Sequence, residues 1–217
     1  MKSDKQLQQD VMDDLRWDPS IDASKVGVSA TSGVITLTGA VPSYFQKQNT
    51  ERIVKRVAGV RAVANDIEVR LLNATERTDS DIAQAALHAL KWDTSVPDEN
   101  VKVSVTKGWV TLEGNVDWNY QRESCEKVIE NLVGVKGVTN RLIVAPHVKS
   151  KDVKSEIKAA LHRYAELEAR NIEVDSADST VTLKGQVRSW AERKEAETAA
   201  WMAPGVTQVK NEIIVSV

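Results

Sequence analysis

One block of sequence occurs three times along this chain. The copies run over residues 26–69, 101–144 and 172–215, so the offset is 75 residues and then 71. They align without gaps over most of their length, and the shared positions are Gly39, Gly114 and Gly185; Gly59, Gly134 and Gly205; and Asn65, Asn140 and Asn211. Such a chain folds as a series of similar small units. A chain of 217 residues usually forms one or two domains, but the three copies predict three small units instead.

A helix is expected in front of each copy. Leu7, Val11 and Leu15 are spaced i, i+4 and i+8, which places them on one helix face. The equivalent residues are Ile82, Ala86 and Leu90 in the second unit, and Val153, Ile157 and Leu161 in the third. We expect Asp79 or Ser80 to cap the second of these helices and Ser150 or Asp152 to cap the third. Adding the helices to the copies gives units at residues 1–72, 73–147 and 148–217.

Inside each copy the hydrophobic pattern alternates first and then becomes helical. Alternating residues on both sides of Ser32-Gly33 predict a hairpin, with Lys107-Gly108 and residues 177–179 as the later turns. Ser43-x-x-Gln46 and Ser189-x-x-Glu192 are capping boxes that begin a second helix. The apolar side of this helix is expected at Val54, Val57 and Ala58, and at Ile129, Leu132 and Val133. Gly59, Gly134 and Gly205 stand where it should end, before a last strand.

The predicted element order is therefore α-β-β-α-β in every unit. The hairpin is antiparallel, whereas a strand–helix–strand crossover favours a parallel pairing, so each sheet should be mixed. We predict an α+β fold of the α/β-sandwich type, with a three-stranded sheet covered on one face by two helices. The other sheet face is left for water, a neighbouring unit or a ligand.

Two motifs resemble those of the BON-domain family. The first, G-x-[VI]-T-L-x-G, ends at Gly39 and at Gly114, and the third unit departs from it with Ser179 in place of the first Gly. The second, G-V-x-x-V-x-N-x-[IL]-x-V, occurs in all three units. The departure concerns the geometry of a turn, and the resemblance covers essentially the whole chain. It implies a bacterial cell-envelope protein of osmotic stress that binds phospholipid, with no catalytic residues and no cofactor.

The residues themselves offer no convergent reactive set. Cys125 has Thr50 and Ala196 at the equivalent positions and acidic residues beside it, whereas a nucleophilic thiol needs a base or a positive neighbour. We expect a packed or half-exposed helix thiol. His88 and His162 are not equivalent, three His with one Cys cannot build a standard Cys/His zinc site, and phosphate-binding glycine motifs are absent. The sequence therefore predicts no enzyme, no metal site and no cofactor.

Basic residues gather on the second helix of the first unit. They are Lys47, Arg52, Lys55 and Arg56, continued by Arg61, with Glu51 as the opposing charge. Such a strip can contact anionic phospholipid headgroups, since each basic residue near a charged membrane contributes about 1 kcal/mol. The alternative is a solvated helix face with a Glu51–Lys55 pair. The net charge of −2 argues against nucleic-acid binding.

Six Trp stand against a single Phe, and most of them recur at equivalent places. Trp17 and Trp92 end the first helices of two units, and this repetition favours a packing role. Trp118 and Trp190 lie near the start of a second helix, and Trp201 within one, where packing is again expected. Trp109 differs, because it follows a hairpin turn where the other units have Val34 and Thr180. We expect an exposed contact residue at Trp109, at a membrane interface or a seam between units.

The leading functional hypothesis is a non-enzymatic envelope protein that binds anionic phospholipid peripherally, through the basic strip and Trp109. The alternative is a protein-interaction or chaperone-like module that binds a client protein or forms homo-oligomers. The chain has no apolar run of the roughly 20 residues that a membrane span needs. Its start, MKSDKQLQQD, lacks an apolar leader, so we expect a cytoplasmic location, or a periplasmic one if Met1 replaces a removed leader.

Overall fold

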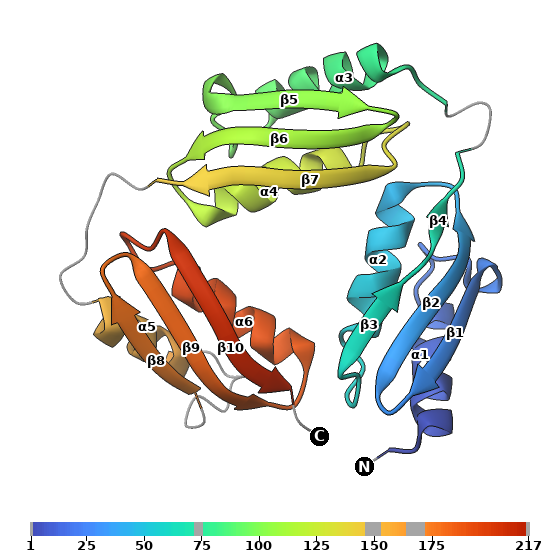
Figure 1. Ribbon diagram of the computed structural model, residues 1–217, viewed down its shortest axis with the longest axis horizontal. Coiled ribbons are helices and arrows are strands. Elements are labelled where there is room, and N and C mark those ends of the chain that lie inside the picture. Colours follow the sequence, from blue (N-terminus) through green and yellow to red (C-terminus); the bar gives the residue numbers. More distant parts are fainter. Residues whose placement is uncertain (1, 72–75, 146–152, 164–171, 216–217) are drawn as a thin grey trace. The chain divides into compact units, whose positions relative to one another are not determined.

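The computed structural model describes residues 2–71, 76–145, 153–163 and 172–215, and each repeat forms its own sheet with two helices (Figure 1). The elements of the first unit are α1 (Asp4–Trp17), a 3₁₀ turn (Ala23–Lys25), β1 (Val26–Thr31), β2 (Val34–Val41), α2 (Tyr44–Val54), β3 (Ala62–Asn65) and β4 (Glu68–Val69). Those of the second are α3 (Asp79–Trp92), a 3₁₀ turn (Asp98–Asn100), β5 (Val101–Thr106), β6 (Trp109–Val116), α4 (Asn119–Glu130) and β7 (Gly137–Val144). The third contains α5 (Val153–Arg163), β8 (Ile172–Ala177), β9 (Thr180–Val187), α6 (Trp190–Trp201) and β10 (Gln208–Val215).

Every sheet is mixed, as predicted. The hairpin strands pair antiparallel, β5 with β6 for example, and the third strand pairs parallel with the middle one, β7 with β6. The orders β5-β6-β7 and β10-β9-β8 leave the third strand at an edge. In the first unit this edge is divided into β3 and β4, which both pair with β2.

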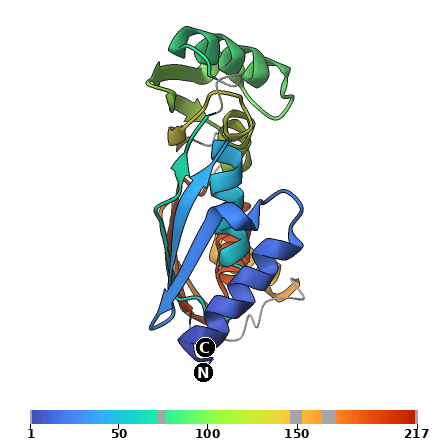
Figure 2. The ribbon, with the colours of Figure 1, turned by 90° about the vertical axis from the view of Figure 1, so that its right-hand side faces the viewer.

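Two helices cover one face of each sheet. The first helix packs on the hairpin strand, α3 on β5 for example, and the second packs on the central and edge strands, as α4 does on β6 and β7. Figure 2 shows the first unit with both of its helices on the same side of the strands. The predicted inner faces of the first helices are confirmed, because Val11, Ala86 and Ile157 are all fully buried. The predicted α+β sandwich is therefore present in all three repeats.

The second helices end earlier than the sequence pattern indicates. α2 stops at Val54, and the next residues form tighter i→i−3 bonds, from Arg56 N–H to Ile53 O and from Val57 N–H to Val54 O. This turn keeps Val57 in the core but leaves Ala58 exposed, and Val133 of the second unit is 51% exposed. The expectation that Ala58 and Val133 lie on the apolar side is therefore wrong. Gly59 has a φ of 102° and ends this turn, five residues after α2.

The N-terminus of α3 differs by one residue from the prediction. Thr78 is the cap, since its side chain accepts from the Asp81 N–H while Asp81 accepts from the Thr78 N–H. Asp79 is thereby free to bind another segment, the hairpin turn. Ser150 and Asp152, proposed as caps of the third unit, lie outside the described residues.

An aspartate at the start of the first helix fastens the hairpin turn. The carboxylate of Asp79 accepts from the N–H groups of Lys107 and Gly108, both at 2.8 Å, and Asp4 does the same for the equivalent turn of the first unit. Lys107 has a φ of 53°, so this contact holds a left-handed turn that costs energy outside glycine. In the third unit, Thr207 Oγ1 instead lies 2.8 Å from Ser179 Oγ. The motif departure at Ser179 thus changes how the turn is held and leaves the hairpin intact.

Gly114 allows a close approach of two backbones. A Cβ atom there would overlap the carbonyl oxygen of Asn100, in the 3₁₀ turn before β5, and φ at Gly114 is 133°. Gly39 meets the carbonyl of Lys25 in the same way. Because glycine has no Cβ, the 3₁₀ turn before the hairpin can lie directly against the middle strand at both positions.

A repeated asparagine joins the edge strand to the second helix. In the second unit, Asn140 Nδ2 donates to Arg122 O at 2.9 Å and to Glu126 Oε2 at 3.1 Å, while its Oδ1 accepts from the Leu142 N–H at 3.1 Å. The same three contacts recur for Asn65 with Lys47, Glu51 and Ile67, and for Asn211 with Arg193, Glu197 and Ile213. We term this set the asparagine bridge. It occupies a backbone group of an edge strand that has no further strand partner in its sheet.

Cys125 is packed inside the second unit, the first of the two alternatives expected for it. Its side chain on α4 is fully buried, and burial raises the pKa of the thiol to about 11, with a smaller contribution from the charge of Asp93. A thiol of this kind is a packed apolar group and a poor nucleophile.

Replacement of Asn140 by Ala should lower the free energy of unfolding of the second unit by about 2 kcal/mol. The Leu142 N–H loses its acceptor, the Arg122 carbonyl and Glu126 each lose a donor, and alanine supplies no replacement. Hydrogen exchange of the α4 and β7 amides measures the change. Asn115→Ala, on the exposed face of β6, is the control and should cost less than about 0.5 kcal/mol. Equal losses in the two variants would mean that the bridge contributes nothing.

Cys125 should react with a thiol-specific disulfide reagent at pH 8 at least about a hundredfold more slowly than a free thiol. The raised pKa leaves little thiolate, and burial prevents access. The release of the coloured thiol product measures the rate, and denaturant should restore full reactivity. Rapid reaction of the native protein would contradict the packing described for α4.

Candidate interaction surface

The basic strip of the first unit is divided between α2 and the segment that follows this helix. Lys47 and Arg52 lie on α2 and are half-buried, while Arg56 and Arg61 are exposed in the segment that follows it. Lys55 comes directly after the last residue of α2. The five residues thus belong to a helix and the loop behind it, and their side chains meet different neighbours.

Glu51 reduces the positive charge in the middle of the strip. Its carboxylate accepts from Lys55 Nζ and, at 2.9 Å, from Asn65 Nδ2. Burial acts to raise the pKa of Glu51, but these hydrogen bonds and the charges of Lys55 and Lys47 outweigh it, and the pKa lies below its usual value. The expected Glu51–Lys55 pair is therefore present, and Glu51 stays ionised as part of the asparagine bridge.

Arg61 and Arg56 are directed to other parts of the unit. The aliphatic part of Arg61 lies against Gly33 at the hairpin turn, as Lys136 lies against Gly108 in the second unit. Arg56 lines a surface hollow together with Lys2 and three acidic residues of α1, which are Asp10, Asp13 and Asp14. A uniform positive strip is therefore not formed.

Trp17 and Trp92 are exposed, which overturns the packing role expected from their repetition. Trp17 is 89% exposed and Trp92 is 75% exposed. The reason is their phase on the helix: Leu15 and Leu90 point into the core, and a residue two positions later lies about 200° further round. The exposure of both tryptophans could therefore have been predicted from the sequence, because each lies two residues after a leucine of the apolar helix face.

Trp92 stands in apolar and basic surroundings. Leu87 is 55% exposed on the same helix, Lys91 precedes Trp92, and the ring of His88 lies 5.8 Å from the ring of Trp92. The acidic residues of α3 are confined to its first turn. The end of α3 therefore presents the ring of Trp92 beside His88 and Lys91, with Leu87 one to two turns earlier on the outer side of the helix and Asp93 directly after Trp92.

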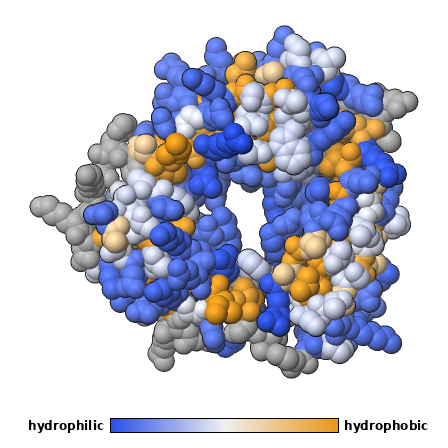
Figure 3. All heavy atoms as spheres, in the orientation of Figure 1, coloured by the Kyte–Doolittle hydropathy of each residue, from blue (hydrophilic) through white to orange (hydrophobic). Residues whose placement is uncertain are grey.

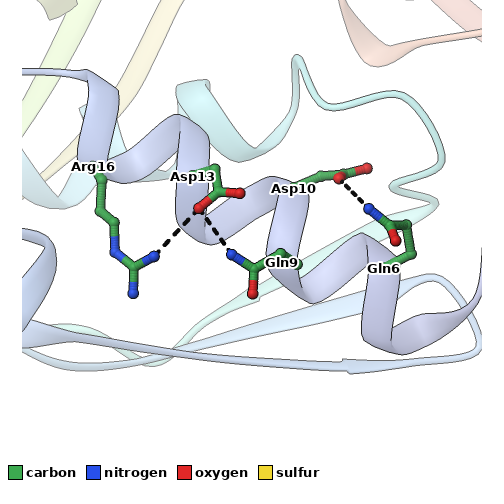
Figure 4. A network of polar contacts seen from close by, with 5 residues as sticks. All are labelled: Gln6, Gln9, Asp10, Asp13 and Arg16. Atoms are coloured by element: carbon green, nitrogen blue, oxygen red, sulfur yellow. Dashed lines mark hydrogen bonds and ion pairs between the residues drawn. The ribbon is translucent and has the colours of Figure 1, made fainter.

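Trp17 has more acidic surroundings. On the outer side of α1, Gln9 Nε2 donates to Asp13 Oδ1 at 2.9 Å, and Arg16 lies 3.3 Å from the same oxygen (Figure 4). Gln6 binds Asp10 in the same way, and Lys2 Nζ lies 2.7 Å from Asp10. Where the second unit has His88, the first has Asp13, so the charge of Arg16 is partly neutralised.

The loop after Trp17 also meets α2. Asp18 accepts from the N–H and hydroxyl groups of Ser20, and Ser20 Oγ accepts from Asn49 Nδ2 at 2.7 Å. The hydrogen bonds from Ser20 lower the pKa of Asp18, and the charge of Arg56 lowers it further. The loop directly after Trp17 therefore contacts the middle of α2 and lies near Arg56.

Trp109 is exposed, as predicted, and lies on the sheet rather than on the helices. It begins β6 and is 50% exposed, and its Nε1–H donates to Thr139 Oγ1 at 2.8 Å. Trp201 is partly buried against the core of the third unit, as expected. Arg193 lies 5.1 Å from the centre of the Trp190 ring at the start of α6.

Within residues 2–71, 76–145, 153–163 and 172–215, no cluster of three or more His, Cys, Asp or Glu side chains is arranged to hold a metal ion. The helices in these ranges are too short or too polar to cross a membrane. His147 lies outside the described residues.

Comparison with known proteins gives one extensive match and one close relative. The BON domain profile matches residues 3–70, 78–146 and 149–216. Osmotically-inducible protein Y of Escherichia coli (strain K12) is 32% identical over 129 residues, which is 57% of this chain and 63% of that protein. The chain thus spans less than two thirds of its relative.

Solved structures of CdsD, described as a structural protein of the type III secretion system of Chlamydia trachomatis, align over 96% and 100% of this chain and 91% and 100% of theirs. Their identity is 14% and their TM-scores are 0.27 and 0.28, values too low to bear on fold or function. The family profile, in contrast, matches three times over nearly the whole sequence, at the repeats that form the three sheets. The chain belongs to the BON-domain family.

Proposed function

We propose that this protein binds the surface of anionic phospholipid membranes peripherally and acts at the cell envelope during osmotic stress. The observation that carries the proposal is the pair of exposed tryptophans, Trp17 and Trp92, at equivalent ends of α1 and α3. The similarity to osmotically-inducible protein Y supports the physiological setting.

Exposed tryptophan is suited to the membrane–water boundary. The indole combines a large apolar body with an N–H donor, so it gains from leaving water without losing its hydrogen bond. At the end of α3, Leu87 can enter the same layer while Lys91 meets a phosphate group. The end of α3 combines an exposed tryptophan, an exposed leucine and a lysine, although the second unit as a whole has more acidic than basic residues.

The basic residues around α2 contribute attraction over a longer range. Arg56 lies near enough to Asp18, the residue after Trp17, to lower the pKa of its carboxyl, whereas Glu51 pairs with Lys55. We therefore assign Lys47, Arg52, Lys55 and Arg56 a salt-sensitive role in approach to the membrane, and the tryptophans the role of anchors.

A protein partner is the competing function, because exposed aromatic rings also suit protein interfaces. In a client-binding or self-associating module, Trp92 would become less exposed to solvent when the partner protein is added, and the module would not bind vesicles. Binding to anionic vesicles in the absence of other protein therefore distinguishes the two functions.

The double variant Trp17→Ser/Trp92→Ser should bind vesicles of phosphatidylglycerol and phosphatidylethanolamine at least about tenfold more weakly for each Trp lost. Co-sedimentation at low salt measures the partition coefficient. Trp109→Val is the matched control, since it removes an exposed Trp from the sheet face and should leave vesicle binding unchanged. If wild-type protein ignores anionic vesicles, the proposed function is wrong.

The variant Lys47→Ala/Arg52→Ala/Lys55→Ala/Arg56→Ala should weaken binding at low ionic strength by about tenfold, less than four independent charges would give because Glu51 and the acidic residues of α1 offset them. The difference from wild type should vanish at high salt. Titration of vesicles at two salt concentrations measures both effects. A loss that persists at high salt would assign these residues to direct contact or to folding.

A further inference from the structure

The indole of Trp109 lies flat across the neighbouring strand β7. A Cβ atom on Gly137 would overlap Cε3 and Cζ3 of the ring, so the ring covers this glycine. Its Nε1–H reaches Thr139, two residues further along the same face of β7. One ring face therefore rests on the sheet in a fixed orientation, and the side chain is still 50% exposed.

The fold of a unit does not require tryptophan at this place. The equivalent pair is Val34 and Ala62 in the first unit, and Thr180 and Gln208 in the third, and both hairpins form with the same register. The ring face that rests on the sheet packs on Gly137, and we call it the lower face of the indole. The upper face is a large, rigid apolar surface held toward solvent, which is the form of a stacking platform.

Hydroxyl groups follow Trp109 along the sheet. The strand register places Ser104, Thr111 and Thr139 in one row beside it, on the face away from the helices. Two residues along a strand span about 7 Å, so these groups lie about one sugar ring away from the indole. In Figure 3, viewed from this side of the second unit, pale residues of intermediate hydropathy lie among blue hydrophilic ones, with separate groups of orange hydrophobic residues.

Charged side chains form the next row. Lys102, Glu113 and Arg141 are direct neighbours across β5, β6 and β7, about 13 Å from Trp109, and all three are exposed. Arg141 Nη1 lies 3.4 Å from Glu113 Oε1. With two cations and one anion, the row has an excess positive charge that one carboxylate would balance.

We propose that this face of the second sheet binds an acidic oligosaccharide of two or three sugars. The C–H face of a sugar ring stacks on the upper face of Trp109, because its hydrogens meet the negative face of the aromatic ring. The hydroxyls of that sugar and the next exchange hydrogen bonds with Ser104, Thr111 and Thr139. A carboxylate on the last sugar meets Arg141 and Lys102, and Arg141 can bind it in bidentate fashion.

A phospholipid fits this face poorly. Its apolar residues, Trp109 and Ile143, lie at opposite ends of the sheet, about 20 Å apart, with hydroxyls and charges between them. No continuous apolar patch is available there for acyl chains. The saccharide site is therefore distinct from the helical surface proposed for membranes, and it does not depend on that proposal.

The test follows the indole N–H signal of Trp109 in ¹H–¹⁵N spectra of the full chain, assigned with Trp109→Val. The probes are trimers of galacturonic acid and of guluronic acid, with the neutral trimer of N-acetylglucosamine for comparison. We expect a saturable shift with at least one acidic trimer, together with shifts of the Thr111 and Thr139 amides, and weaker binding of the neutral trimer.

Trp109→Val should abolish binding of the acidic trimer, and Arg141→Ala should weaken it about tenfold or more, with backbone spectra that remain those of the folded chain. Trp17→Ser should leave it unchanged. The proposal is overturned if neither acidic trimer moves the Trp109 signal at about 10 mM, if the neutral trimer binds equally well, or if anionic vesicles move this signal instead.

Discussion

In each unit the position of the second helix on the edge strand depends on the asparagine bridge. A sheet of three strands with two helices on one face has a small core, and its third strand has a strand partner on one side only. Asn140 joins that strand to the middle of α4 through a helix carbonyl and Glu126, and it occupies the backbone N–H of Leu142 at the edge. One side chain thus fixes the helix on the sheet and protects an edge that would otherwise be open to pairing. In the third unit Arg193 extends this protection, because its guanidinium donates to the carbonyls of Asn211 and Ile213.

Repetition in the sequence predicts the elements well because their periodicity depends on local geometry. The spacing of Ile82, Ala86 and Leu90 predicts a helix because one helix face is buried. The alternation around Lys107-Gly108 predicts a hairpin because a two-residue turn joins its strands. The asparagine bridge was visible as three aligned Asn, but its chemistry was not, because its partners lie 14 and 18 residues away in the chain. The position of Arg61 was missed for the same reason: its contact is with Gly33, in a hairpin that the sequence does not place beside it.

Repetition alone does not separate packing from function. Trp17 and Trp92 recur and are exposed, whereas Leu15 and Leu90 recur and are buried. The helix phase distinguishes them, since a position about 200° from the apolar face can recur only for a reason other than the core. Lys47 and Arg193 show the opposite case: both are basic and equivalent, yet Arg193 is used on the edge of its own sheet. A basic residue on the second helix is therefore not by itself a sign of a binding surface.

The second unit combines these properties on two sides. Its helical layer carries Trp92 with Leu87 and Lys91, and the opposite face of its sheet carries Trp109 above a row of hydroxyls and a row of charges. The two surfaces differ in chemistry, because the first places a cation beside apolar groups and the second separates its apolar groups by polar ones. Since the core and the two helices lie between them, occupation of one surface does not obstruct the other. The site proposed for a membrane surface and the site proposed for an acidic saccharide therefore lie on opposite faces of one small domain, and the two proposals do not compete for the same residues.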